Sequence, residues 1–169
     1  MPDEPPLRDA TAAEMKALAH PLRLRILRLV LDEALTNQQL AERVGRDPGT
    51  VLFHVRALER GGFIAADAPR PGRRGTTERP YRSTGKSWTL RMPPDVGHTT
   101  AVLQAVAEEV LQAGDDAVIA SVRLGVRLRD EEVAELRRRL AAIGDEFAAK
   151  DDPTGRPIGL LTLIHRRRS

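Results

Sequence analysis

The sequence contains no cysteine among its 169 residues. This absence excludes thiolate metal sites, disulfide frameworks and cysteine nucleophiles. Aromatic residues make up only 3% of the chain, and no apolar run reaches the roughly 20 residues that a membrane-spanning helix needs. The first residues, MPDEPPLRD, are acidic and rich in proline, unlike a signal peptide. We therefore expect a disordered start over residues 1–10 and a cytoplasmic protein without a membrane partner.

Charge is unevenly distributed along the chain, although the net charge is only +3. Residues 43–91 carry eleven Arg or Lys and four Asp or Glu, a net charge of +7. Residues 92–164 carry eight basic and thirteen acidic residues, a net charge of −5. The basic segment suits a partner rich in phosphate.

The most informative stretch runs from Thr36 to Ile64 and predicts two short helices joined by a tight turn. Thr36 can cap the first helix, with Gln39 completing a capping box. Gly45 stands where the chain must take a left-handed conformation, which glycine adopts at little cost. The inner face of this helix is expected to comprise Leu40, Ala41 and Val44.

The second helix of this pair is expected to begin at Pro48, with Asp47 as its N-cap, and to end before Gly61 and Gly62. Its residues divide into two faces at the helical repeat of 100° per residue. The apolar face holds Val51, Val55 and Leu58, with His54 on its flank, and the opposite face holds Gly49, Leu52, Phe53, Arg56 and Arg60. A solvated amphipathic helix would share this pattern, but two arginines and an aromatic ring also suit the major groove of DNA.

Two further helices precede this pair. Thr11 and Glu14 form a second capping box, and the helix that follows is expected to break at His20-Pro21, because proline disfavours helical geometry in the preceding residue. The next helix runs from Pro21 to about residue 32 and should complete a three-helix core. Its arginines, Arg23, Arg25 and Arg28, are expected to be solvated.

A β-hairpin wing is expected after the second helix. Residues 63–68 and 81–88 read as two strands, and the loop PRPGRRGTTERP between them has no apolar residue to bury. Such a wing can lie along the DNA backbone or enter the minor groove. Its arginines are Arg70, Arg73, Arg74, Arg79 and Arg82.

Residues 15 to about 88 resemble the winged helix-turn-helix domain of the ArsR-like bacterial regulators. The resemblance rests on ALAHPLRLRILRLV, on LTNQQLAERVGRDPGTVLFHVRALERGGFI and on ERPYRST. It implies a homodimer that binds an inverted-repeat operator in double-stranded DNA and represses transcription until an effector binds. Metal-sensing relatives use a cysteine pair or clustered acidic and histidine ligands, which this chain lacks, so no metal or other cofactor is expected. Leu52 departs from the small polar residue that many relatives carry at the corresponding position.

The remainder of the chain predicts a small α/β region in the order helix, strand, helix, strand. The first helix starts at His98 or Thr99 and ends at Ala113, and its apolar side is expected to mediate dimerisation through Val102, Leu103, Val106 and Val110. Strands are expected at 117–124 and 158–165, the second one buried, with a long helix starting after its cap Asp130. A purely structural dimerisation region and one that also binds a small hydrophobic effector are both consistent with this pattern. The acidic pairs, including Glu108-Glu109, are expected to be solvated surface charges rather than a catalytic or metal site.

These observations predict an α+β chain with a disordered start at 1–10, a winged helix-turn-helix domain at 11–92 and a dimerisation region at 93–169. The leading hypothesis is a DNA-binding transcriptional regulator with recognition helix 48–60 and basic wing 68–80, and the alternative is a winged-helix module that binds another protein. No catalytic grouping, phosphate loop or metal cluster indicates an enzyme. The expected DNA contacts are Thr36, Gln38, Arg46, Gly49, Thr50, Leu52, Phe53, Arg56, Arg60, Arg73, Arg74 and Arg79.

Overall fold

The computed structural model describes residues 8–72, 77–93, 95–152 and 154–167. The chain divides into two compact units, residues 1–119 and 120–169. The predicted boundary at 92–93 differs from this division, because the helix that follows it packs on the first unit. The mixture of helices and small sheets confirms the α+β class.

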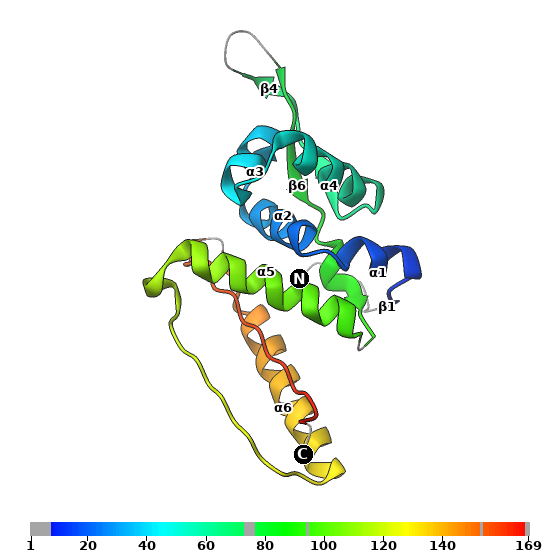
Figure 1. The fold of residues 1–169 in the computed structure, drawn as a ribbon, viewed down its shortest axis with the longest axis vertical. Helices are drawn as coiled ribbons and strands as arrows, with labels where there is room; N and C mark the ends of the chain where they lie inside the picture. Colours follow the sequence, from blue (N-terminus) through cyan, green and yellow to red (C-terminus); the bar gives the residue numbers. More distant parts are fainter. Residues whose placement is uncertain (1–7, 73–76, 94, 153, 168–169) are drawn as a thin grey trace. The chain divides into compact units, whose positions relative to one another are not determined.

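The first unit holds five α-helices among its described residues, and the first four lie at the places that the sequence predicts (Figure 1). Both capping boxes are present, at Thr11 and at Thr36. Gly45 ends its helix with φ of 65°, the left-handed conformation expected of it. The helices are α1 (Ala12–Leu18), α2 (Pro21–Asp32), α3 (Asn37–Val44), α4 (Pro48–Arg60) and α5 (Val96–Ala113).

Three short strands form an antiparallel sheet in the order β2-β6-β3. They are β2 (Leu35–Thr36), β3 (Ile64–Ala66) and β6 (Pro80–Ser83). The hairpin continues outward through β4 (Arg70–Pro71) and β5 (Thr77–Glu78), and it extends beyond α3 and α4 (Figure 1). The predicted wing is therefore present, but its returning strand ends at Ser83, and a 3₁₀ helix, η2 (Lys86–Thr89), follows.

The N-terminal prediction of disorder is wrong for the residues that the structure describes. Arg8 and Asp9 form strand β1 (Arg8–Asp9), which pairs in parallel with β7 (Leu90–Arg91). The amide of Ala10 also donates to the carbonyl of Arg91 at 3.1 Å. Residues 1–7 lie outside the described part of the chain.

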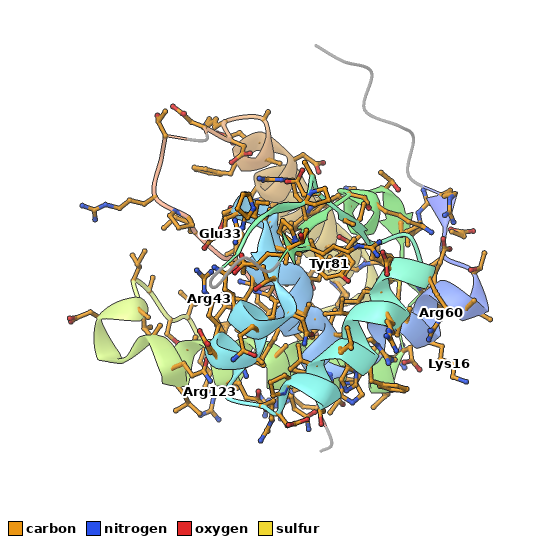
Figure 2. The ribbon with its side chains drawn as sticks, turned by 90° about the horizontal axis from the view of Figure 1, so that it is seen from above. Lys16, Glu33, Arg43, Arg60, Tyr81 and Arg123 are labelled. Carbon is orange, nitrogen blue, oxygen red and sulfur yellow. The ribbon has the colours of Figure 1, made fainter. Side chains whose placement is uncertain are left out.

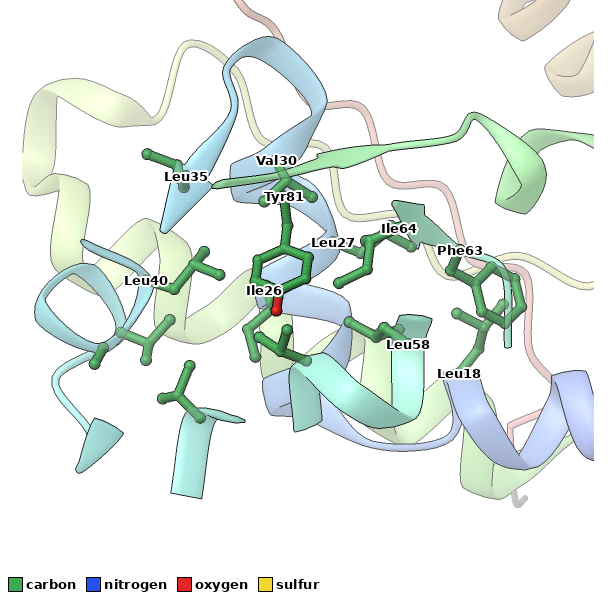
Figure 3. Packing of buried hydrophobic residues seen from close by; sticks show 14 of the residues in the cluster. Leu18, Ile26, Leu27, Val30, Leu35, Leu40, Leu58, Phe63, Ile64 and Tyr81 are labelled. Atoms are coloured by element: carbon green, nitrogen blue, oxygen red, sulfur yellow. The ribbon is translucent and has the colours of Figure 1, made fainter. Parts of the chain in front are cut away.

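A single apolar core joins the helices to the sheet (Figure 3). The apolar faces predicted for α3 and α4 are buried, and Val51, Val55 and Leu58 are fully enclosed. Tyr81 on β6 lies among the side chains of α2 and α3, whereas Phe63 packs near Leu18 of α1 (Figure 3). This core holds α4 in place from one side only, so its other face is left at the surface.

Helix α5 starts two or three residues earlier than predicted. The carboxylate of Asp95 caps it by accepting from the amide of His98 at 2.6 Å. Its small residues Ala101 and Ala105 are buried against α2, where small side chains allow the two helices to approach closely. A short 3₁₀ helix, η3 (Asp115–Ala117), follows it.

The second unit contains one long helix, α6 (Asp130–Ala148), with Glu131 and Glu132 in its first turn as predicted. Arg129, rather than Asp130, is its N-cap. The strands predicted at 117–124 and 158–165 are not formed in this single copy: neither segment has strand pairing among the described residues, and 158–165 is exposed rather than buried. Residue types alone indicate that a segment can form a strand, but a strand also needs a second backbone to pair with.

Candidate nucleic-acid interface

The exposed face of α4 carries one continuous stripe of residues. Gly49, Phe53, Arg56 and Arg60 follow one another at intervals of four, three and four residues, which places them on one side of the helix. All four are exposed, and the Phe53 ring keeps 63% of its surface in solvent. A single exposed aromatic ring is common on protein surfaces, so this face is distinguished by the ring together with two exposed guanidinium groups.

Arginines on and before α4 differ from those around it in having no acidic partner. Arg46, Arg56 and Arg60 make no side-chain hydrogen bond or ion pair with any residue that the structure describes. Arg60 lies at the outer edge of the first unit (Figure 2). By contrast, Arg43 on α3 is paired with Glu33, and Figure 2 labels both residues.

The start of α4 is fixed by two side chains. The Asp47 carboxylate accepts hydrogen bonds from the amides of Gly49 at 2.8 Å and Thr50 at 3.1 Å. The side-chain amide of Asn37 on α3 donates to the carbonyl of Pro48 at 2.9 Å, which ties the two helices of the motif together. The sequence indicated the Asp47 cap, whereas the Asn37 contact spans the turn and has no signal in the local pattern.

Thr36 is less suited to a DNA contact than the sequence pattern predicts. Its side chain is buried, and its hydroxyl accepts from the amide of Gln39 at 3.2 Å within the capping box. Gln38 is exposed, but its amide nitrogen donates to Glu42 at 3.1 Å. Leu52 is half-buried at the edge of the α4 stripe, so its role stays a prediction.

The base of the wing is held by its own arginines. Arg70 donates to Glu78 at 3.1 Å across the hairpin and to Gln39 of α3 at 2.9 Å. Arg79 donates to Glu59 of α4 at 2.8 Å. Both guanidinium groups are therefore engaged with the protein, and they set the position of the hairpin relative to the two helices. Arg73 and Arg74 lie outside the described residues.

The far strand of the hairpin is fixed through Asp67. Its carboxylate accepts from the amide of Ala68 at 2.8 Å and from Arg82 at 3.4 Å. These bonds lower the pKa of Asp67, the backbone bond having the largest effect. Arg82 is thus a hairpin contact in this structure.

Glu14 of α1 contacts residues of two other segments, β1 and η2. Its carboxylate accepts from Arg8 at 2.6 and 2.9 Å and lies 2.8 Å from the ammonium of Lys86. The Arg8 bonds, followed by the Lys86 and Thr11 bonds, hold the pKa of Glu14 far below its usual value. The capping box predicted a role for Glu14, but the contacts with Arg8 and Lys86 depend on the fold.

Two histidines lie against each other on the inner side of α4. The rings of His20 and His54 are 4.4 Å apart between centroids, and the Nδ1 atom of His54 is buried with no hydrogen-bond partner among the described residues. His20 also caps α2, where its Nδ1 accepts from the amide of Leu22 at 3.2 Å. Burial lowers the pKa of both side chains.

The arginines of α2 are not all solvated, contrary to the prediction. Arg25 is buried and donates to Glu108 of α5 at 2.7 Å and to Gln112. Arg28 forms an ion pair with Glu109. Arg23 donates to the carbonyls of Ala17 and Lys16, the latter at 2.7 Å, at the end of α1. The pair Glu108-Glu109, predicted to be solvated, therefore binds α5 to α2.

On α5, the residues predicted for dimerisation do not all share one environment. Leu103 and Val110 are exposed, whereas Val102 and Val106 are half-buried. Val96, Leu103 and Val110 recur every seven residues on the side facing away from Ala101 and Ala105. Among the described residues, no group of three or more acidic, histidine or cysteine side chains could hold a metal ion. No described helix is both long and apolar enough to cross a membrane.

Residues 18–65 match the family model described as "Helix-turn-helix domain". No match was found among curated proteins. A homodimeric winged helix-turn-helix DNA-binding domain from Mycobacterium bovis, a possible ArsR-family regulator, is 29% identical, with a TM-score of 0.38 over 61% of this chain and 82% of that one. Reduced HlyU from Vibrio cholerae is 19% identical, with a TM-score of 0.36 over 56% and 84%.

A mutant of MepR from S. aureus bound to an oligodeoxyribonucleotide is 17% identical, with a TM-score of 0.34 over 81% of this chain and 79% of that one. The family match covers α2 to β3, the part of the chain that contains the turn and the exposed stripe of α4. The hairpin after it completes the winged form of the motif. The chain therefore contains a helix-turn-helix domain that a β-hairpin follows, which is the winged form of the motif.

Proposed function

We propose that the protein is a homodimeric repressor in which α4 of each copy enters the major groove of an inverted-repeat operator. The observation that supports this proposal is the exposed α4 stripe, whose guanidinium groups have no acidic partner among the described residues. A guanidinium that is bound to a carboxylate of its own protein has fewer donors left for a base, whereas Arg56 and Arg60 make no such bond within the part of the chain that the structure describes. Arginine with two parallel donors is the usual reader of guanine in the major groove.

The residues of the stripe take different roles in this proposal. Arg56, in the middle of α4, reads a guanine edge, and Phe53 packs against a thymine methyl or a sugar. Gly49 lets the helix backbone approach a phosphate. Arg46 and Arg60 lie at the two ends and contact the flanking backbone, together with Thr50 and Gln38.

The wing contributes contacts of lower sequence specificity. Because Arg70 and Arg79 are bound to Gln39, Glu78 and Glu59, they orient the hairpin. Arg73 and Arg74, which lie between β4 and β5 in the sequence, are the residues proposed to contact backbone or minor groove, where the negative potential attracts arginine. Arg79 would reach phosphate only by leaving Glu59.

The dimer is proposed to form through α5. That helix buries Ala101 and Ala105 against α2 and leaves Leu103 and Val110 exposed on its other side. A seven-residue repeat of exposed apolar residues suits packing against the same helix of a second copy. Repression, and its relief by a small hydrophobic effector, stay predictions from the family resemblance.

Selection of bound DNA from a random pool tests the function and provides the operator. We expect an inverted repeat whose half-sites are separated by one turn of the DNA helix or a multiple of it. A two-fold dimer places its two recognition helices at that spacing. A single unrepeated site would contradict the dimer. Failure to enrich any sequence, at low salt and over repeated rounds, would favour the alternative of a protein-binding module.

Substitution of Arg56 tests the direct-readout role on the selected operator. Arg56→Ala should weaken operator binding by about 1–3 kcal/mol while changing affinity for random DNA much less, because a base contact is lost. Titration by fluorescence anisotropy at one fixed salt concentration measures both affinities. Arg43→Ala is the matched control, since Arg43 is an exposed arginine already paired with Glu33. Equal losses on operator and random DNA for Arg56→Ala would show that Arg56 binds phosphate instead.

A further inference from the structure

The second unit has a folded helix but no core. None of its described residues is buried, and α6 itself has no buried side chain. Folding of a segment of this size must bury apolar surface to offset the loss of conformational entropy. A surface outside this unit must therefore cover its apolar residues, which are Val122, Leu124, Val126, Leu128, Ile143, Phe147, Ile158, Leu160, Leu161, Leu163 and Ile164.

Two extended segments of this unit have the sequence of strands without the pairing. Over residues 121–129, apolar residues alternate strictly with Ser, Arg or Gly, so that one face is apolar and the other carries Arg123, Arg127 and Arg129. Residues 158–165 have apolar side chains on both faces, with Leu161 and Leu163 opposite Leu160 and Ile164. The first pattern is typical of a half-buried strand and the second of a strand inside a sheet.

The backbones of both segments lack partners. Within the part of the chain that the structure describes, no backbone–backbone hydrogen bond involves residues 118–128 or 156–167. Each residue except proline contributes one donor and one acceptor, and when apolar side chains become buried these groups need partners too. The surface that covers this unit must therefore supply strand edges as well as apolar side chains.

The lengths of the elements fit a strand, helix, strand unit. The 19 residues of α6 span about 28 Å at 1.5 Å per residue, and nine extended residues such as 121–129 span about 30 Å. Val133, Leu136, Leu140, Ile143 and Phe147 form one face of α6, which would cover such strands. One copy supplies only two strands, and a two-stranded sheet is marginal in water.

The exposed apolar area has the size of one partner's share in a stable dimer. The eleven side chains of this unit named above, at roughly 70 Å² each, expose on the order of 800 Å². Each partner buries about that area in a standard protein interface. A second copy also provides identical strand edges, which a two-fold axis brings together in antiparallel orientation.

We propose that residues 121–129 and 158–165 of two copies form one four-stranded sheet covered by two α6 helices, in which the two 158–165 strands pair with each other. The strands at 158–165, apolar on both faces, would lie at the centre, and the arginine-bearing strands at 121–129 would form the edges. The C-terminal unit is then a dimerisation surface that folds only in the dimer. This inference rests on the proposed homodimer and adds to it a second interface.

Hydrogen exchange of the full chain, measured by mass spectrometry at several concentrations, tests the inference. Amides of 121–129 and 158–165 should be protected in the dimer and lose that protection on dilution, at the concentration where sedimentation shows monomers. Protection that persists in the monomer would show that the strands pair within one chain and would overturn the proposal. Rapid exchange in the dimer would overturn it as well.

A matched pair of variants tests which face of the edge strand is covered. Leu124→Asp should raise the dimer dissociation constant about 100-fold, because it places a carboxylate on the apolar face. Arg123→Asp introduces the same carboxylate on the opposite face and should change the dissociation constant less than about threefold. Equal effects of the two variants would contradict the proposed sheet.

The failure of this inference is distinguishable from failure of the proposed function. Arg56→Ala should lose operator specificity and keep protection at 121–129 and 158–165. A dimer that binds the operator without such protection would overturn the shared sheet alone. A dimer with full protection that selects no DNA sequence would overturn the proposed function alone.

Discussion

At the scale of single residues, buried His54 and half-buried His20 form a pair on the inner side of α4, directly behind the proposed reading face. His54 packs against His20 and contacts the exposed Phe53 ring edge-on, with 5.3 Å between centroids. Burial is the main cause of the lowered pKa of both histidines, and the charge of Arg23 acts in the same direction. The folded state therefore favours the neutral form of both rings.

This pair makes the stability of the first unit depend on pH. An unfolded histidine has a pKa of about 6.5. Above that pH neither state binds the proton, and the contribution of the pair is fully present. As the pH falls below about 6.5, the unfolded state takes up protons that the folded state resists, so the free energy of unfolding decreases until the lowered folded-state pKa values are passed.

Urea denaturation at a series of pH values between 7.5 and 5 (roughly the histidine range) checks this prediction. His54→Leu should give a shallower decrease in stability over this range than the unsubstituted protein. Ala13→Leu, which replaces an exposed residue without a titratable group, is the control and should leave the slope unchanged. An unchanged slope in His54→Leu would contradict the assignment of the pH dependence to this pair.

At the scale of elements, the turn between α3 and α4 determines where the reading helix begins. Gly45 takes a left-handed conformation, Asp47 caps two amides of α4, and Asn37 bonds the carbonyl of Pro48. Together these contacts hold the first turn of α4, which carries Gly49 and Thr50. The exposed stripe is therefore presented by a helix whose start is fixed from the protein side.

Loss of the Asp47 cap should lower the stability of this element. Asp47→Ala removes the acceptor for the amides of Gly49 and Thr50 and should reduce the free energy of unfolding by about 1 kcal/mol. Asp47→Ser keeps an oxygen acceptor at the same place and should retain most of that stability. Urea denaturation of the two variants measures the difference, and equal losses would show that the cap contributes little.

At the scale of the first unit as a whole, α5 is joined to the helix-turn-helix core by ion pairs of two different kinds. Arg25 is buried and donates to Glu108 and Gln112, whereas Arg28 and Glu109 are partly exposed. Both pairs join α2 to α5. Since α5 is the proposed dimer helix and α2 packs on α4, these contacts lie between the proposed dimer surface and the proposed reading face.

The two pairs should differ in their contribution to stability. Arg25→Ala should lower the free energy of unfolding by about 2 kcal/mol, because buried hydrogen bonds and the packing of the arginine stem are lost together. Arg28→Ala should cost less than about 1 kcal/mol, as is usual for exposed ion pairs. Denaturation of both variants under one condition checks the ranking, and the reverse order would contradict it.

Local signals in the sequence predicted most of the helix-turn-helix domain. Caps, glycines and prolines act within a few residues, so the starts of α1, α3 and α4 and the turn at Gly45 could be inferred without the fold. The buried face of α4 also followed from its periodicity, which leaves Gly49, Phe53, Arg56 and Arg60 outside. These features determine the class of the protein and its proposed reading face.

Contacts between distant segments could not be inferred in this way. The burial of Arg25 against α5, the pairing of Arg8 and Asp9 with β7, and the anchoring of Arg70 and Arg79 each join residues far apart in the chain. Residue type alone suggested solvated arginines and a disordered start, because a charge or a polar terminus is usually exposed. Only the fold showed which of these groups have partners.

The sequence by itself determined that this chain is a winged helix-turn-helix protein, since capping and periodicity are local properties of the backbone. Tertiary structure decided which arginines have acidic partners among the described residues, because pairing depends on where acidic groups from other elements lie. It also decided the state of 121–129 and 158–165. A strand pattern indicates that a segment can pair with another strand. Among the described residues of one copy, neither segment forms such a pair.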